Sequence, residues 1–213
     1  MSAGHSDAPI GVYEYLSYDD VSEIFRPWDS RALDVAERVA ELIRGRMPDA
    51  RVEHVGSSAI PGCDGKGPVD LLLMYGPGRL AAARDALDGL SFQRQTGADP
   101  FPEERPMRLG TYDYDGETFR LHVHVIQEDD REAREQIYFR DRLRSAPELV
   151  EEYIARKRAS ISALNGQPDG SAPNIAYNAG KQPFIRRILA EMDAAGTEAE
   201  PAQREGTGCE TVC

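Results

Sequence analysis

The apolar run Val-Asp-Leu-Leu-Leu-Met-Tyr at residues 69–75 constrains the fold of this 213-residue chain more than any other segment. Gly67 and Pro68 precede the run, and Gly76 and Pro77 follow it. A short apolar run between such residues is typical of a buried strand. We therefore expect a sheet that contains this strand, and the neighbouring segments predict how the sheet is covered.

Helical and extended patterns alternate around this run. The predicted elements are a helix over 30–47, strands at 51–55 and 69–75, a helix over 79–90, hairpin strands at 107–113 and 118–126, and helices from there to about 193. Asp115-Gly116 is a strong hairpin turn signal. This order predicts a mixed α/β (α+β) fold, followed by a C-terminal helical part over 131–193.

Three details of the helices are predicted as well. Ser30 is expected to cap the first helix, whose apolar stripe consists of Leu33, Ala36, Ala40 and Ile43. Ala146-Pro147 is expected to begin one of the later helices, and Pro183 to kink or restart the last one.

The net charge of the chain limits the classes of molecule that it is expected to bind. Asp and Glu number 37 against 25 Lys and Arg, a net charge of −12. Because duplex nucleic acid is bound through Lys and Arg, this composition excludes it as a default partner. Positive charge is nevertheless concentrated in residues 131–187, which hold 11 basic and 7 acidic residues. Only three of the basic residues are lysines, at positions 66, 157 and 181.

The remaining global features predict a cytoplasmic protein without a membrane partner. No apolar run approaches the roughly 18 residues that a membrane span needs. Cys63, Cys209 and Cys213 do not form a disulfide framework, and the polar N-terminus lacks a signal-peptide pattern. We expect a disordered stretch over 1–10, a single domain over 11–193 and a flexible tail over 194–213.

The segment from His54 to Asp70 is the strongest candidate for chemistry. Gly56 and Ser57 directly follow a predicted strand, where a helix is expected to begin, so backbone N–H groups and a hydroxyl are exposed to an anion such as phosphate. Asp70 opens the next strand beside this loop, where a carboxylate suits a divalent ion. Lys66 supplies a positive charge to the same anion. A plain turn with a capping Asp and a solvated Lys is the alternative interpretation.

Four segments resemble the GrpB family, which belongs to the nucleotidyltransferase-fold superfamily. Residues 54–70 match the family pattern H-[IV]-G-S-[TS]-[AS]-[VI]-P-G-x-x-x-K-P-x-x-D without a gap, with Gly67 in place of the proline. Residues 121–125 resemble its H-L-H-V strand, 139–144 its F-R-D-x-L-R helix and 177–185 its Y-x-x-x-K-x-x-F-I end. The resemblance covers about residues 30–190.

The resemblance implies a nucleotidyltransferase-like mixed sheet with flanking helices. Gly56, Ser57 and Ser58 are then expected to hold the triphosphate of an NTP co-substrate, with Mg or Mn as the metal. In active members of the wider superfamily, two carboxylates two residues apart on the following strand hold the metals. Here Asp70 is followed by Leu72, so the second carboxylate is missing. That replacement opposes two-metal nucleotidyl transfer.

His122 and His124 share one face of the second hairpin strand. Together with Asp70 they are predicted to form a three-ligand site for one transition metal such as Zn, Mn, Fe or Ni. Two alternatives stay open: the histidines contact substrate directly, or one of them is packed in the core. Asp70, Lys66, His122 and His124 are the candidate catalytic residues.

The helical part supplies candidate ligand contacts. Arg140 and Arg144 lie one turn apart on a predicted helix, where they are predicted to clamp phosphate or a substrate carboxylate; surface salt bridges are the alternative. Lys181 and Arg120 are predicted to contribute further charge. Tyr177 is a candidate to stack on a base, with packing against other side chains as the alternative.

Three functions remain open. The first is an enzyme that transfers a nucleotidyl group from an NTP to a small acceptor, or adenylates it. The second is a nucleotide or phospho-ligand binding module that lost transfer with the second carboxylate. The third is an enzyme with a His-liganded metal on the same scaffold. In each case the partner is a small anionic molecule or nucleotide.

Overall fold

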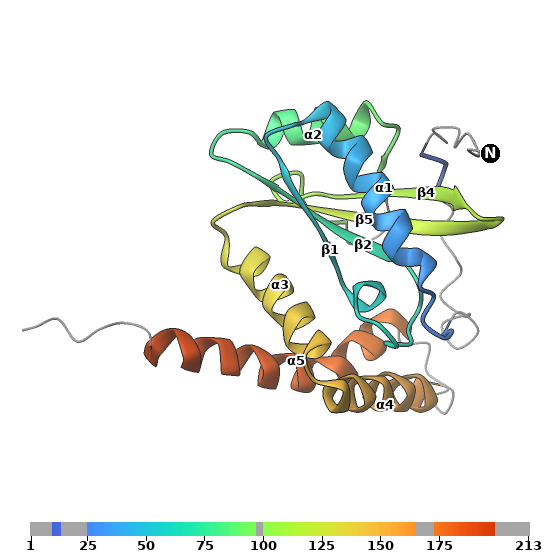
Figure 1. Ribbon diagram of the computed structural model, residues 1–213, viewed down its shortest axis with the longest axis vertical. Coiled ribbons are helices and arrows are strands. Elements are labelled where there is room, and N and C mark those ends of the chain that lie inside the picture. The colour runs from blue at the N-terminus through green and yellow to red at the C-terminus, as the bar shows by residue number, and fades with distance from the viewer. Residues whose placement is uncertain (1–9, 14–24, 97–99, 165–172, 199–213) are drawn as a thin grey trace, which may run out of the picture.

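The elements follow the predicted order in the computed structural model, which describes residues 10–13, 25–96, 100–164 and 173–198 (Figure 1). They are α1 (Arg31–Arg46), β1 (Arg51–Val55), the 3-10 turn η2 (Ser57–Ala59), β2 (Val69–Tyr75), α2 (Leu80–Asp88), β3 (Gln93–Arg94), β4 (Met107–Tyr114), β5 (Glu117–Gln127), α3 (Arg131–Arg144), α4 (Pro147–Leu164) and α5 (Pro173–Glu198). The predicted mixed α/β fold with a C-terminal helical part is confirmed.

The five strands form one mixed sheet in the order β1-β2-β5-β4-β3. The pair β2–β5 is parallel, whereas the other pairs are antiparallel. β2, the apolar run, therefore lies between β1 and β5. Five of its seven residues are at most 2% exposed, and Tyr75 is 7% exposed. The predicted burial of this run is confirmed.

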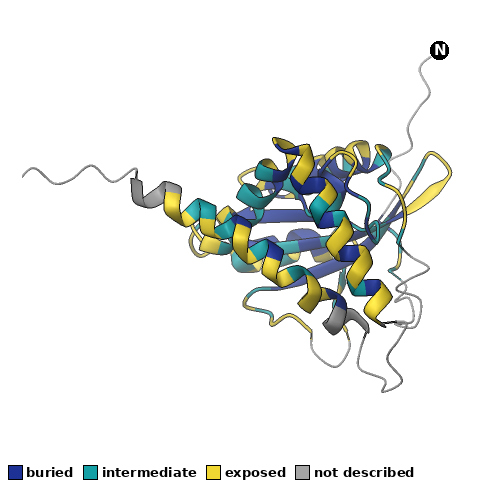
Figure 2. Cartoon of the chain, turned by 90° about the horizontal axis from the view of Figure 1, so that it is seen from below, coloured by how far each residue is buried: buried dark blue, intermediate teal, exposed yellow. Residues whose placement is uncertain are grey.

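Alternation along β2 separates the two faces of the sheet. Val69, Leu71 and Leu73 point into the larger core beneath α1 and α2. Leu72 and Met74 point to the opposite face, where they pack with Ala133 of α3. Figure 2 shows buried strands between helices whose outward sides are exposed. Asp70 lies on the α3 face, so the fold presents this carboxylate toward the helical part.

The helical part has a core of its own, and that core includes the motif loop. Leu143 of α3, Tyr153 of α4 and Phe184 of α5 pack together with Ile60 and Cys63. Tyr153 and Phe184 stack with ring centroids 5.1 Å apart. The loop after β1 is thus clamped between the sheet and the three helices.

Several local predictions differ from the structure. Ser30 precedes α1 without a side-chain capping bond, and Leu33 is 37% exposed because Ala32, Val35 and Val39 share the buried stripe instead. The helix expected after Gly56 is only the single turn η2. The two-residue strand β3 was not predicted, since so short a strand has no periodicity.

The last helix also differs from prediction. α5 continues through Pro183 as one element and ends at Glu198, beyond the predicted 193, so the first five residues of the predicted tail are helical. The expected disorder of residues 1–9, the tail from 199 onward and its two cysteines lie outside the described residues.

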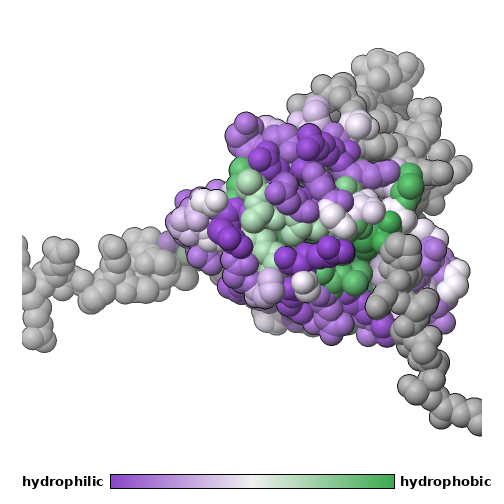
Figure 3. Space-filling view, turned by 90° about the horizontal axis from the view of Figure 1, so that it is seen from above, coloured by the Kyte–Doolittle hydropathy of each residue, from purple (hydrophilic) through white to green (hydrophobic). Residues whose placement is uncertain are grey.

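The outer surface agrees with a layered domain whose helices face solvent. Viewed from the end at which α2 lies, hydrophilic residues predominate around smaller hydrophobic areas (Figure 3). None of the helices in the described ranges is long and apolar enough to cross a bilayer.

Candidate phosphate-binding site

The loop that follows β1 brings its backbone against Asp70. Gly56 has φ of 71°, a conformation that favours glycine, and η2 begins at the next residue. A Cβ atom at Gly56 would overlap Oδ2 of Asp70. Glycine is therefore required at this position for two reasons: the positive φ angle and the close approach of the Asp70 carboxylate.

Asp70 and His122 form a hydrogen-bonded pair at the start of the parallel strands. The register places them opposite each other, and Nδ1 of His122 lies 3.0 Å from Oδ1 of Asp70. Nε2 of the same ring lies 3.2 Å from the hydroxyl of Tyr13. Burial acts to raise the pKa of Asp70, but the hydrogen bond from His122 and the electrostatic attraction of that ring outweigh it, so the pKa lies below its ordinary value. Asp70 is thus a carboxylate at neutral pH.

His124 lies two residues beyond His122 on β5, opposite Leu72 of β2. Its Nδ1 is buried and has no hydrogen-bond partner among the described residues. Burial is the main reason that its pKa falls to about 4, so the ring is neutral. Phe101 packs edge-on against it, with ring centroids 5.8 Å apart.

All three lysines of the chain converge on this loop from different elements. Lys157 of α4 is fully buried. Its Nζ lies 3.4 Å from Ser57 Oγ and 3.3 Å from Cys63 Sγ, and it donates a hydrogen bond to the carbonyl of Asp64. Lys66 and Lys181 both lie over the buried ring of Tyr177, with Nζ atoms 4.7 and 4.4 Å from its centroid. We call Lys66, Lys157 and Lys181 the lysine cluster.

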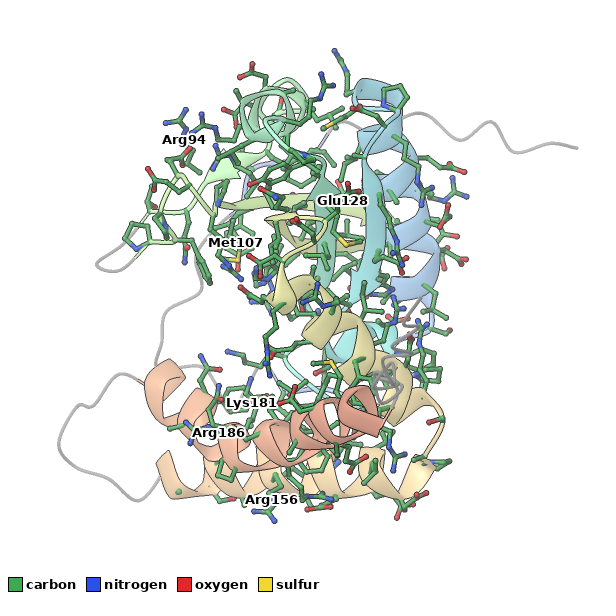
Figure 4. All side chains as sticks on the ribbon, turned by 90° about the vertical axis from the view of Figure 1, so that its left-hand side faces the viewer. Arg94, Met107, Glu128, Arg156, Lys181 and Arg186 are labelled. Atoms are coloured by element: carbon green, nitrogen blue, oxygen red, sulfur yellow. The ribbon has the colours of Figure 1, made fainter. Side chains whose placement is uncertain are left out.

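Lys181 carries the clearest electrostatic signature of the three. Burial, followed by the charges of Lys66 and Lys157, lowers its pKa to about 8. No carboxylate lies within ion-pair distance of Lys181 in the part of the chain that the structure describes. Figure 4 shows Lys181 on the side of α5 that faces the sheet, whereas Arg156 lies on the outer side of α4. Lys181 is thus a half-buried cation without an ion pair among the described residues, and Asp70 acts on it only through its charge.

A cleft of about 570 Å³ opens between the sheet and the helical part at this point. One side consists of Gly56, Ser57 and Asp70, and Lys181 and Gln182 of α5 lie across from them. The side chains of Glu132, Glu135, Gln136, Phe139, Tyr153, Ile185 and Leu189 complete the wall. The volume falls within the range of small-molecule sites.

Comparison with known proteins shows the family of this chain. The family model described as GrpB protein matches residues 20–191. The chain belongs to the GrpB family. The UPF0157 protein PA4798 of Pseudomonas aeruginosa is 32% identical over 73% of this chain, and the UPF0157 protein VC_A0354 of Vibrio cholerae is 30% identical over 70%. The alignments span 62% and 71% of those proteins, so less than two thirds of the first one is covered.

A solved structure of another GrpB protein shows the same fold. GrpB from Enterococcus faecalis aligns with a TM-score of 0.59 and 17% identity, over 79% of this chain and 98% of that one. The Cid1 poly(U) polymerase with Mg and 3'-dATP bound also aligns, at 12% identity over 68% of this chain and 46% of that chain. Its TM-score of 0.45 is too low to say anything about shared chemistry.

Two arginines of the GrpB motifs have structural contacts in place of the predicted clamp. All three guanidinium nitrogens of Arg140 bond to Glu53, Asp141 or the carbonyl of His54. Nε of Arg144 donates to the carbonyl of Ala59 at 2.9 Å. Both residues therefore brace β1 and the loop from behind, and neither lines the cleft.

Residues inside and outside the GrpB motifs also support the loop. Nε2 of His54 lies 3.0 Å from Ser58 Oγ, and Trp28 donates to the Ser58 carbonyl at 2.9 Å. Arg120 donates to the carbonyl of Lys66 at 2.6 Å. Tyr177 is 2% exposed, and Lys66 and Lys181 cover its ring. The ring therefore supports the lysine cluster and has no free face on which a base could stack.

The predicted metal triad of Asp70, His122 and His124 does not form. No group of three His, Cys, Asp or Glu side chains in the described ranges is arranged to hold a metal ion. Both nitrogens of His122 lie within hydrogen-bonding distance of Asp70 or Tyr13, and His124 lies opposite Leu72 in the register of the two strands. Leu72 is itself fully buried among apolar side chains. As they are placed here, Asp70, His122 and His124 therefore do not fit a single transition metal.

Two residues of the site were missed by the sequence interpretation. Lys157 lies in no family motif, and the scarcity of lysine was its only signal. Tyr13 precedes the matched region and reaches His122 because the backbone of Gly11 pairs with Thr111 at the edge of β4. No local pattern marks either contact.

Proposed function

We propose that this GrpB-family protein binds the triphosphate of a nucleoside triphosphate in the cleft between the sheet and the helical part. The observation that carries the proposal is the convergence of the lysine cluster on the Gly56–Ser57 turn. Backbone N–H groups of such a turn and nearby ammonium groups are a common phosphate-binding combination. A buried positive charge without an acid partner is costly unless an anion completes the site.

Within the cleft, each element has a distinct part. Lys181 reaches the ligand from α5, and the Gly56–Ser57 turn faces it from the sheet side. Lys157 acts through Ser57, whose hydroxyl it orients at 3.4 Å. The rest of the cleft, toward α3, leaves room for the nucleoside or for a small acceptor.

Nucleotidyl transfer to a small acceptor is the second candidate. The ionised Asp70 beside the loop favours it, while the burial of Leu72 opposes the two-metal version. Incubation with each NTP and a candidate acceptor, with Mg or Mn present, tests this function by pyrophosphate release. Nucleotide binding without release would leave a binding module.

Gly56→Ala should abolish ATP binding. The added methyl group overlaps Asp70 Oδ2 and strains a left-handed backbone position. Titration calorimetry with ATP measures the loss, which we expect to exceed about 100-fold because the loop and Asp70 cannot both keep their places.

Gly78→Ala is the matched control. Gly78 likewise has a positive φ, 75°, that favours glycine, but no atom lies within 4 Å of its added Cβ. Gly78→Ala should bind ATP as the unmodified protein does. Equal affinity of both variants, each folded by circular dichroism, would rule out the loop as the phosphate site. Absence of ATP binding by the unmodified protein would refute the function itself.

Phosphate binding should weaken as the pH rises through about 8. Free Lys181 loses its proton there, since its pKa is lowered to about 8. A bound phosphate favours the charged ammonium, so binding takes up a proton above this pH. We expect the affinity to fall by up to about tenfold per pH unit above 8. Calorimetry at pH 7, 8 and 9 in two buffers of different ionisation enthalpy measures the proton uptake; pH-independent affinity would contradict the role of Lys181.

A further inference from the structure

The site has few of the ligands that a metal-dependent phosphate site needs. Mg²⁺ in such sites is held by one or two carboxylates together with the phosphates. Asp70 is the carboxylate that lies beside the Gly56–Ser57 turn, and its Oδ1 already receives a hydrogen bond from His122. Position 72, which shares its face, holds a fully buried leucine. A second carboxylate beside Asp70 is therefore missing, and the other acids of the cleft, Glu132 and Glu135, belong to the wall that α3 forms.

Positive charge is present at the same place in another form. The lysine cluster brings three ammonium groups to the loop, from the 60–68 segment, from α4 and from α5. Arg120 adds a fourth positive group beside Lys66, to whose carbonyl it donates. Mutual repulsion is already visible in the cluster, because Lys66 and Lys157 both act to lower the pKa of Lys181. A divalent cation placed among these groups would be repelled in the same way.

The lysines and a metal ion have the same effect on a polyphosphate. Either one neutralises the charge on the phosphate oxygens. An ammonium group is a compact charge with three donors on a flexible stem, so it adapts to whichever oxygen is nearest. The chain has 25 Lys and Arg residues, yet every one of its three lysines lies in this cluster. Compact charges thus surround the Gly56–Ser57 turn, with Lys181 in the wall of the cleft and Lys157 acting through Ser57.

We infer that the lysine cluster takes the place of the divalent metal ion, so that this protein binds a polyphosphate without metal. The inference rests on the phosphate site proposed above and goes beyond it by naming the form of the ligand. The bound species is the metal-free polyanion. A metal-complexed polyphosphate carries less negative charge and should bind more weakly.

Titration calorimetry with inorganic tripolyphosphate and with ATP tests this inference. Each ligand is titrated into the full-length protein with a chelator present and again with excess Mg²⁺. We expect binding with the chelator, and an affinity at least about threefold weaker with Mg²⁺, because the metal competes for the phosphate charge. Binding that appears only with Mg²⁺, or that tightens tenfold with it, would overturn the inference while upholding the phosphate site. No binding of either ligand under both conditions would instead overturn the proposed function, and this inference with it.

The two ligands distinguish the sources of the phosphate. Equal affinities for tripolyphosphate and ATP would show that the phosphate chain alone is bound, and tighter binding of ATP would show that the nucleoside adds contacts. Both results support a metal-free site as long as the chelator leaves binding intact.

Variants assign the effect to the cluster. Lys66→Met should weaken chelator-resistant binding of tripolyphosphate by about 10- to 100-fold, the range for a lost bond to a charged group. Arg186→Met, an exposed cation on α5, is the matched control and should leave the affinity unchanged. Weakening by both variants alike would mean that net charge, rather than the cluster, governs binding. Circular dichroism is recorded first, so that only folded variants are compared. Equal weakening by two folded variants would overturn the assignment to Lys66.

Discussion

Replacing Lys181 with methionine should stabilise the ligand-free protein and at the same time remove phosphate binding. Burial and two neighbouring lysines lower the pKa of Lys181 from 10.5 to about 8, so the fold disfavours the ammonium form. Each pKa unit corresponds to about 1.4 kcal/mol, and a neutral side chain of similar length should recover about 2–3 kcal/mol at pH 7. Urea unfolding at pH 7 measures the gain.

The pH dependence of unfolding provides an independent check on Lys181. Between about pH 8 and 10.5 the unfolded chain binds one proton more than the folded chain at this residue. The free energy of unfolding of the unmodified protein should therefore rise with pH in this window, and this rise should be absent in Lys181→Met. Arg186→Met, exposed on the same helix, should change neither stability nor binding. A loss of stability in Lys181→Met at pH 7 would show that Lys181 is a structural residue and not a strained binding group.

Leu72→Asp should unfold the protein rather than create a magnesium site. Leu72 is fully buried, and Val55, Met74, Ile126 and Ala133 surround it. An uncompensated charge or an unpaired carboxyl group among apolar side chains should cost about 4 kcal/mol or more. Urea unfolding with and without Mg²⁺ measures the loss and any rescue by the metal.

Leu72→Met is the control for this substitution, since it conserves volume and polarity and should cost less than about 1.5 kcal/mol. The prediction would be wrong if Leu72→Asp remained folded and Mg²⁺ raised its melting temperature. That result would mean that position 72 still faces a site competent for metal, and the metal-free interpretation of the cleft would have to be abandoned.

The strands of the motif region were predicted with correct bounds. β1 and β2 begin and end where expected because Pro48 precedes the first strand, and Gly and Pro residues flank the second. The hairpin was found through Asp115-Gly116, whose positive φ values are those that its turn requires. β3 and the outward position of Leu33 were missed, since pairing and burial depend on segments far away in the sequence.

The candidate site was predicted only in part, for a similar reason. Gly56, Ser57 and Asp70 are close in sequence, so a local pattern was enough to group them. Arg140 and Arg144 were expected in the cleft because one helix face carries both. Their contacts instead depend on which side of α3 meets β1. On that side, the guanidinium groups of both arginines donate to Glu53 or to backbone carbonyls.

The sequence by itself determined the buried strand, the glycine turn before it and the missing second carboxylate, because each depends on residues within a few positions of one another. Only the tertiary structure decided that Lys157 and Lys181, more than 90 residues beyond the loop, stand beside Lys66 and Ser57. It also decided that His122 pairs with Asp70 while His124 does not. Strand register and helix packing set these distances, and neither is encoded by a local spacing of residues.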